Sequence, residues 1–131
     1  VKAYTTRVGN GPLPTELEEP LQSQVRTLGN EFGAVTGRPR RCGWFDAVVV
    51  RYAARVNGLT GLALTKLDVL DTLDRLALCT GYRVDGEVLS EFPADLQLLV
   101  RAEPVYEWHE GWRTSTQGAR ALADLPAAAR A

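Results

Sequence analysis

Glycine and proline divide this 131-residue sequence into apolar segments, each long enough for one strand or one helix. The stretch GNGPLP at 9–14 excludes regular structure, and Gly29, Gly58 and the pair Asp85–Gly86 interrupt the chain again. Asp-Gly is also a strong signal for a hairpin turn. No apolar run approaches the roughly 20 residues that cross a bilayer. The chain is therefore expected to fold as one globular unit built from short elements.

The first two segments have different periodicities. Residues 2–8 are rich in β-forming side chains and predict a strand. Leucine and valine then recur at helical spacing and predict a helix over about 16–28. Thr15 and Glu18 have the spacing of a capping box at its start. Pro20 is compatible with this helix only if the first turn begins close to that proline.

The alternation continues through the rest of the chain. The mostly apolar segment 43–57 favours a buried helix by its length, and a buried strand is the alternative. The remaining elements are expected as a strand over 60–69, a helical turn over 71–76, a strand over 76–84, a short helix near 94–100, a strand near 104–108 and a loop over 109–118. Strands alternating with helices are typical of an α/β sheet with crossover connections.

Charge and cysteine content exclude several classes of function. Fifteen Lys plus Arg and sixteen Asp plus Glu give a net charge of -1, so no global field favours nucleic acid or an anionic membrane. Any site for an anion must be local. Cys42 and Cys79 form neither a disulfide framework nor a zinc motif, and the first residues lack the apolar core of a signal peptide. These features favour a soluble, cytoplasmic protein.

Three arginines, Arg38, Arg40 and Arg41, lie in the glycine- and proline-containing stretch GAVTGRPRRCGW at 33–44. Glycine permits unusual backbone conformations and proline stiffens the chain, so such a loop presents guanidinium groups in fixed directions. The planar fork of arginine suits carboxylate and phosphate groups through two parallel hydrogen bonds. The alternative is that these arginines are surface residues or pair with the glutamates of 16–19.

A second candidate site is LTKLD at 64–68, at the carboxyl end of an expected strand, where α/β sheets bind ligands. One carboxylate can accept hydrogen bonds from the ring N–H and the exocyclic amine of guanine, while a lysine stem lies along the base. Lys66 and Asp68 have the Lys-x-Asp spacing of such a site. Adenine would leave the carboxylate unpaired. A simple charge pair at a strand end is the alternative.

Other candidate residues give weaker indications of a functional site. The turn RVGNGPLP at 7–14 lacks the Gly-Lys-Ser/Thr of a phosphate loop, so it either lets backbone approach a sugar or base or is only a tight turn. His109 is the single histidine and has no carboxylate or nucleophile spaced to partner it, which favours a structural role. Trp44 and Phe45 are expected in the core. No catalytic residue is assigned.

Four stretches in register give a resemblance to a known family. They are VKAYTTRVGNGPLPTEL, GNEFGAVTGRPRRCGWFD, NGLTGLALTKLDVLD and YRVDGE. Together they closely resemble adenylosuccinate synthetase, the ligase of purine and AMP biosynthesis that joins aspartate to IMP with GTP through 6-phosphoryl-IMP. The resemblance implies an α/β fold that is part of a mixed, mostly parallel sheet with crossover helices, of the P-loop-NTPase-like family, lacking the amino-terminal phosphate-loop region.

The resemblance also implies roles for particular residues. The segment 34–40 corresponds to a mobile loop that binds L-aspartate, in which Arg38 touches aspartate and the ribose side of IMP. Val35 stands where some members have threonine, so one hydroxyl contact is absent or moved. The implied aspartate- and IMP-binding residues are Val8, Ala34, Val35, Thr36, Gly37, Arg38, Pro39 and Arg40, and the implied GTP-binding residues are Arg40, Lys66, Leu67 and Asp68.

The family's phosphate loop, its catalytic aspartate and histidine and its Mg²⁺ ligands have no counterpart in this sequence. We therefore expect residues 1–131 to be a single partial domain, the carboxyl-side portion of a longer homodimeric ligase, inactive alone, with Mg²⁺ bound elsewhere. The first alternative is a catalytically inactive, stand-alone nucleotide-binding module derived from the ligase. The second is an unrelated α/β interaction domain whose arginines contact an acidic protein.

Overall fold

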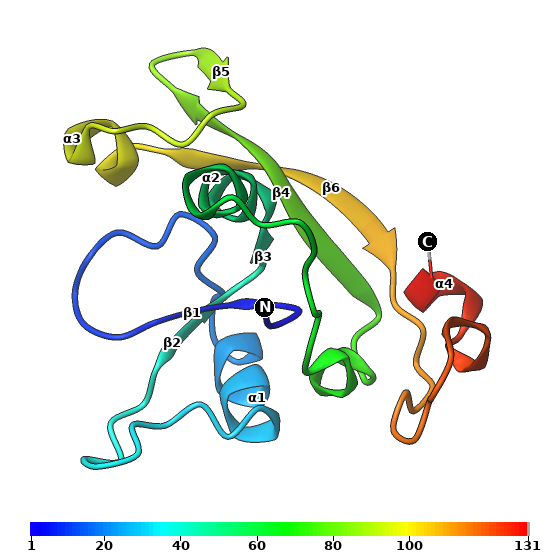
Figure 1. Cartoon of the computed structure of the whole chain (residues 1–131). Coiled ribbons are helices and arrows are strands. Elements are labelled where there is room, and N and C mark those ends of the chain that lie inside the picture. Colours follow the sequence, from blue (N-terminus) through cyan, green and yellow to red (C-terminus); the bar gives the residue numbers. More distant parts are fainter. Residues whose placement is uncertain (131) are drawn as a thin grey trace.

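The computed structural model describes residues 1–130 and is organised around one long pair of strands (Figure 1). β4 (Arg75–Val84) and β6 (Glu103–Glu110) run antiparallel and side by side across the molecule. β5 (Glu87–Leu89) pairs antiparallel with the end of β4, and β3 (Phe45–Asp46) pairs parallel with its middle. Because β6 lies along nearly all of β4, β3 and β5 occupy the opposite edge of that strand.

A smaller sheet carries the amino-terminal part of the chain. β1 (Thr5–Arg7) pairs antiparallel with β2 (Arg41–Gly43), and α1 (Leu21–Leu28) packs against β2. The chain then passes through β3 into α2 (Ala47–Asn57), which packs on β4. The arginine loop, residues 31–40, therefore follows the end of α1 and leads directly into β2.

The remaining elements are short. They are the 3-10 helix η1 (Leu67–Leu70), α3 (Leu96–Val100) between β5 and β6, the 3-10 helix η2 (Leu122–Asp124) and α4 (Ala127–Arg130). None of the helices in residues 1–130 has both the length and the apolar character needed to cross a membrane.

The α/β class with a mixed sheet is confirmed, but the expectation of a mostly parallel sheet is wrong for this part of the chain. Only β3 and β4 are parallel, and they are joined through α2 as a crossover requires. The other pairs are antiparallel. Asp85 and Gly86 both have positive φ, which is the geometry of a tight hairpin turn, so β5 must return antiparallel to β4.

The helix expected over 16–28 begins only at Leu21. Residues 15–17 instead lie beside β2, where the Leu17 N–H donates to the Cys42 carbonyl at 2.9 Å. A Cβ on Gly43 would lie 2.7 Å from the carbonyl oxygen of Thr15, so glycine permits this close approach. Pro20 is the N-cap without a side-chain cap, and the expected capping box is wrong.

The strand expected over 60–69 does not form. Thr65 makes one isolated parallel bridge to Lys2, and the turn expected over 71–76 is replaced by η1 and the start of β4. Leu62 and Leu64 are about half exposed. Residues 1–3 lie beside residues 63–65, because the Thr65 N–H donates to the Val1 carbonyl at 2.8 Å and the Ala3 N–H donates to the Thr65 carbonyl at 2.9 Å. This pairing is too short to make residues 60–69 a strand.

Two groups of buried side chains hold the elements together. One joins the small sheet and α1 to η1 and β4, and it contains Trp44 as expected, with Phe45 half-buried nearby. The other lies under α2 and α3 and includes Tyr82. Cys42 and Cys79 are buried free thiols. Asp46 caps α2, because its side chain accepts hydrogen bonds from the N–H groups of Val48 and Val49. This cap is the reason that the helix begins at Ala47 and not at residue 43.

Candidate functional site

The arginine loop is a closed turn. The Gly33 N–H donates to the Arg38 carbonyl at 2.8 Å, and the Gly37 N–H donates to the Gly33 carbonyl at 2.9 Å. Phe32 and Pro39 form a β-bridge, and Gly37 has a φ of 64°, which favours glycine. Residues 34–39 are all exposed. The loop therefore has a defined shape and presents its tip to solvent.

The three arginines differ in how much of their charge is already engaged. Arg41 donates to both carboxylate oxygens of Glu16, at 2.8 and 2.5 Å, and to the Gly9 and Gly11 carbonyls at 3.1 and 2.6 Å. This pairing was the alternative expected for these arginines, and it explains how the glycine turn at 9–11 is held. Arg38 is exposed, and no described side chain or carbonyl accepts a hydrogen bond from it.

Arg40 is intermediate between these two. Its Nη1 donates to Glu31 at 3.0 Å, while its Nε is buried and has no partner among the described residues. The buried Nε cannot be reached from solvent, but the side chain as a whole is 32% exposed, so its exposed part is open to a ligand.

Glu31 is the centre of a cluster that sequence reasoning missed. Its side chain has no exposed surface. Oε1 accepts from the Tyr4 hydroxyl at 2.6 Å and from Lys66 Nζ at 2.9 Å. Oε2 accepts from Lys2 Nζ at 2.7 Å and from Arg40 at 3.0 Å. Nothing in the sequence distinguishes Glu31 from the exposed glutamates nearby, since its partners lie up to 35 residues away.

These partners set the charge state of Glu31. Burial by itself would raise the pKa of its carboxyl, but hydrogen bonds from Lys2, Tyr4 and Lys66 outweigh burial and lower the pKa from 4.5 to about 2. Glu31 is therefore a carboxylate at neutral pH. Three cations surround one anion, so the cluster carries an excess of positive charge although the whole chain has a net charge of -1.

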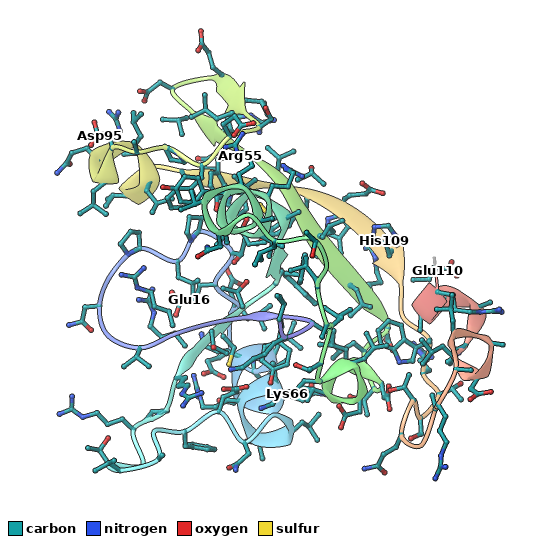
Figure 2. All side chains as sticks on the ribbon, viewed as in Figure 1. Glu16, Arg55, Lys66, Asp95, His109 and Glu110 are labelled. Atoms are coloured by element: carbon teal, nitrogen blue, oxygen red, sulfur yellow. The ribbon has the colours of Figure 1, made fainter. Side chains whose placement is uncertain are left out.

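The triplet Lys66, Leu67 and Asp68 begins in an unusual backbone conformation. Lys66 has a φ of 60°, in the left-handed region that a non-glycine residue seldom adopts. Its ammonium donates to the Gly29 carbonyl at 2.5 Å as well as to Glu31. Figure 2 shows Lys66 near the bottom of the molecule, beside η1. Asp68 is exposed, and no described donor engages its carboxylate.

An open pocket of about 390 Å³ adjoins the triplet. Thr116 and Gln117 line it from the other side. Asp71 fixes this wall, because its carboxylate accepts from the Thr116 N–H at 2.8 Å and the Trp112 indole N–H at 2.7 Å. No sequence pattern connects residues 112–117 with the triplet. Residues 112–117 follow the end of β6, and the fold places them beside the triplet.

The other predicted positions lie apart from this cluster. Val8 is 73% exposed beside the glycine turn, where Gly9 has a φ of 84°. His109 lies on β6, away from Lys66 (Figure 2). Its Nε2 is 3.3 Å from Glu107, so the expectation that no carboxylate is spaced to partner it is wrong. His109 lines an apolar cavity of about 290 Å³ together with Trp44 and Trp112. Nothing in these surroundings gives His109 a substrate-facing role.

The side chains of residues 1–130 do not form a recognisable metal site. In the part of the chain that the structure describes, no three His, Cys, Asp or Glu side chains converge in a way that could hold a metal ion. These residues do not fit a magnesium centre, so we derive no step of a reaction through a metal held here. That Mg²⁺ is bound elsewhere stays a prediction.

The fold and the site define a class of protein: a mixed α/β chain in which a glycine-rich loop and a lysine–aspartate turn present unpaired charges to solvent. The family model of adenylosuccinate synthetase matches residues 1–131. The chain belongs to the adenylosuccinate synthetase family, as its sequence stretches indicated.

Individual relatives agree with this assignment. The adenylosuccinate synthetase of Magnetococcus marinus is 60% identical over 131 residues, covering 100% of this chain and 30% of that protein. That of Geotalea daltonii is 58% identical over 129 residues, covering 98% of this chain and 30% of the relative. A structure of fully ligated adenylosuccinate synthetase from Plasmodium falciparum matches with a TM-score of 0.93 at 38% identity, covering 99% of this chain and 32% of that chain. The chain thus spans about 30% of the length of the curated relatives it matches.

Proposed function

We propose that the protein joins L-aspartate to IMP at the expense of GTP, and that this chain contributes the aspartate loop and the guanine-recognition triplet. Family membership supports the reaction. The observation that supports these two roles is that some charged side chains have partners and others do not. Arg41 and Lys66 bind Glu16 and Glu31. Arg38 and Asp68 have no partner among the described residues. Exposed charged groups without a partner in the protein are suited to bind a charged or polar ligand.

Arg38 binds a carboxylate of aspartate in this proposal. Its guanidinium can form two parallel charge-assisted hydrogen bonds, and the closed turn of residues 33–38 fixes the backbone position from which the side chain extends. Aspartate is then held with its amine toward C6 of the purine. Positioning of this kind accounts for a large part of many rate enhancements. The remaining residues of the loop, 34–37 and Pro39, shape the pocket around the substrate.

Asp68 selects guanine. Its carboxylate accepts from the ring N–H and the exocyclic amine of the base, two donors that adenine does not offer at these positions. The ammonium of Lys66 is already fixed by Gly29 and Glu31, so the apolar stem of this lysine is the part left to lie along the base. Leu67 is half-buried between them and adds apolar surface to the same pocket.

The chemical step itself draws on groups outside this chain. The γ-phosphoryl group of GTP is transferred to O6 of IMP, and the amine of aspartate then displaces phosphate at C6, forming the C–N bond. The described residues hold aspartate and guanine, and the charges that stabilise the transferred phosphoryl group come from elsewhere in the protein. Homodimer formation, a cytoplasmic location and a contact of Val8 with the IMP ribose remain predictions of the same kind.

The proposal is tested by replacing the matching segment of the Magnetococcus marinus synthetase with residues 1–131 and measuring adenylosuccinate formation beside the parent enzyme. Loss of a charge-assisted pair of hydrogen bonds, about 3 kcal/mol, predicts that Arg38→Leu raises the KM for aspartate about 100-fold. Arg41→Leu is the matched control, because Arg41 is engaged by Glu16, and its KM for aspartate is expected within about threefold of the chimera. An inactive chimera, or equal effects of both substitutions, would contradict the proposal.

Guanine recognition is tested with Asp68→Asn in the same chimera. An amide in place of the carboxylate can donate to the carbonyl oxygen that xanthine carries where guanine has its amine. We therefore expect the variant to prefer xanthosine triphosphate to GTP, with the KM for aspartate unchanged. Unaltered nucleotide preference would remove Asp68 from the base site. Binding of a fluorescent guanine nucleotide to the 131 residues alone, without activity in the chimera, would instead favour the stand-alone binding module.

A further inference from the structure

Glu31 lies between the two parts of the proposed site. It follows the end of α1 and precedes the arginine loop, and its own backbone N–H donates to the Arg26 carbonyl at 2.8 Å. Its carbonyl accepts from the Arg40 N–H at 2.9 Å. Main-chain and side-chain hydrogen bonds thus hold Glu31 against both the helix and the far end of the loop.

The carboxylate uses its full capacity for hydrogen bonds. Two oxygens accept four donors, which is about the number of lone-pair sites a carboxylate has. The donors come from three segments distant in sequence: Lys2 and Tyr4 from the amino-terminal segment, Arg40 from the loop, and Lys66 from the guanine triplet. Neither carboxylate oxygen is open to solvent, since the Glu31 side chain is fully buried.

This arrangement links the loop and the triplet through one group. Lys66 Nζ on Oε1 and Arg40 Nη1 on Oε2 are joined by the same carboxylate, so a displacement of either cation alters the position available to the other. The carboxylate is fully buried and its cations are only partly exposed, which makes the contact stronger than the exposed pairs of this chain, such as that of Arg55 with Glu91.

We propose that Glu31 is a positioning residue that couples the aspartate loop to the guanine triplet. It rests on the function proposed above. Glu31 holds the ammonium of Lys66 away from the base, so that only the stem of the lysine faces the nucleotide. It also holds Nη1 of Arg40, so that the exposed part of this side chain is left for the ligand. One carboxylate therefore sets the geometry for both substrates.

The test is Glu31→Gln in the synthetase chimera, with the KM for GTP and the KM for aspartate measured separately from kcat. We expect both KM values to rise at least about tenfold, with kcat per folded enzyme reduced less than about threefold. A merely structural role would lower the amount of folded enzyme and leave both KM values unchanged. Glu16→Gln is the matched control, since it removes the same charge from the neighbouring arginine pair and is expected to leave both KM values within about twofold.

A second variant covers the case in which Glu31→Gln does not fold. Glu31→Asp keeps the charge but withdraws the carboxylate by one methylene, so we expect a smaller rise of both KM values, about threefold, in soluble enzyme. Values within experimental error of the chimera for both substrates would overturn the proposal, as would a rise confined to one substrate. An active chimera with unaffected Glu31 variants refutes only the coupling, whereas an inactive chimera refutes the proposed function.

Discussion

Glu31 and Asp46 are both buried carboxylates, and their surroundings have opposite electrostatic character. Three cations and a tyrosine face Glu31. Asp46 meets only neutral donors: the Tyr82 hydroxyl on one oxygen and the Val48 and Val49 N–H groups on the other. Burial raises the pKa of Asp46 above 3.8, and these hydrogen bonds reduce that rise without reversing it. For Glu31 the partners reverse the effect of burial and lower the pKa to about 2.

The difference shows that hydrogen-bond number alone does not decide the charge state of a buried acid. Neutral donors stabilise a carboxylate less than ammonium and guanidinium groups do, because they carry no net charge to offset the lost hydration. The Asp46 contact serves a local purpose, the start of α2. The Glu31 contact joins segments that the chain keeps far apart, and it lies where ligands are proposed to bind.

Neutralising each acid separates the two cases most strongly. Glu31→Gln leaves three cations around an uncharged amide. We expect the free energy of unfolding to fall by about 3 kcal/mol. This value is at the low end of the range for breaking a buried ion pair, because the cations are partly exposed. Asp46→Asn keeps a good N-cap and removes an unfavourably buried charge, so a loss below about 1 kcal/mol is expected. Urea unfolding of both variants measures the difference, and equal losses would abolish the contrast.

Removing the tyrosine hydroxyl from each site gives the next largest effect. Tyr82→Phe leaves one oxygen of Asp46 buried without a described donor, and about 2 kcal/mol of stability should be lost. Tyr4→Phe is the matched control at Glu31, where Lys66 still donates to the same oxygen, and about 1 kcal/mol is expected. The unfolding midpoints of the two variants check the order. A larger loss for Tyr4→Phe would show that the cations do not satisfy Glu31.

The pH dependence of stability should have opposite signs at the two sites. Glu31 has a folded-state pKa below its ordinary value, so its contribution is complete above about pH 4.5 and is lost as pH falls toward 2. Asp46 has a raised folded-state pKa, so its contribution improves as pH falls through that pKa.

Each group can change the slope by at most about 1.4 kcal/mol per pH unit. Urea titrations between pH 5 and 2 should therefore show a shallower decline for Glu31→Gln and a steeper one for Asp46→Asn than for the unsubstituted chain. Identical slopes in all three would mean that neither acid titrates differently in the folded state.

The smallest effect concerns the two thiols, which lie beside the two acids. Burial and the nearby Glu31 carboxylate raise the pKa of the Cys42 thiol. Burial and the nearby Asp46 carboxylate raise the pKa of the Cys79 thiol to about 12. Both thiols should react slowly with iodoacetamide at pH 8. Glu31→Gln is expected to speed labelling of Cys42 a few-fold more than labelling of Cys79, as measured by mass spectrometry. Equal acceleration would mean that the substitution loosens the whole chain.

The local pattern was sufficient for several elements. Helical spacing and length predicted α2, the Asp85–Gly86 turn predicted the β4–β5 hairpin, and the short apolar segments near 94–100 and 104–108 predicted α3 and β6. It failed where a contact distant in sequence decided the outcome. Residues 15–17 have helical spacing but pair beside β2. Residues 60–65 have the composition of a strand but pair only briefly, through Thr65, with the first residues of the chain.

The candidate site divides in the same way. Arginines on a glycine-rich turn and a Lys-x-Asp triplet are local features. The sequence and the family resemblance could therefore identify these candidate residues: Arg38, Arg40, Lys66 and Asp68. They could not say which of the arginines had a free charge. Arg41 and Arg40 differ from Arg38 because Glu16 and Glu31 lie next to them in space, and those distances follow from the fold.

The sequence by itself determined the family, the order of most elements and the residue types available for binding, because each depends on neighbours within a few positions. Only the tertiary structure decided that Glu31 is buried among Lys2, Tyr4, Arg40 and Lys66, and that the sheet around β4 is mainly antiparallel. The physical reason is that a buried charge is stable only where several distant donors converge on it. Convergence of that kind is a property of packing and has no signature in the order of residues.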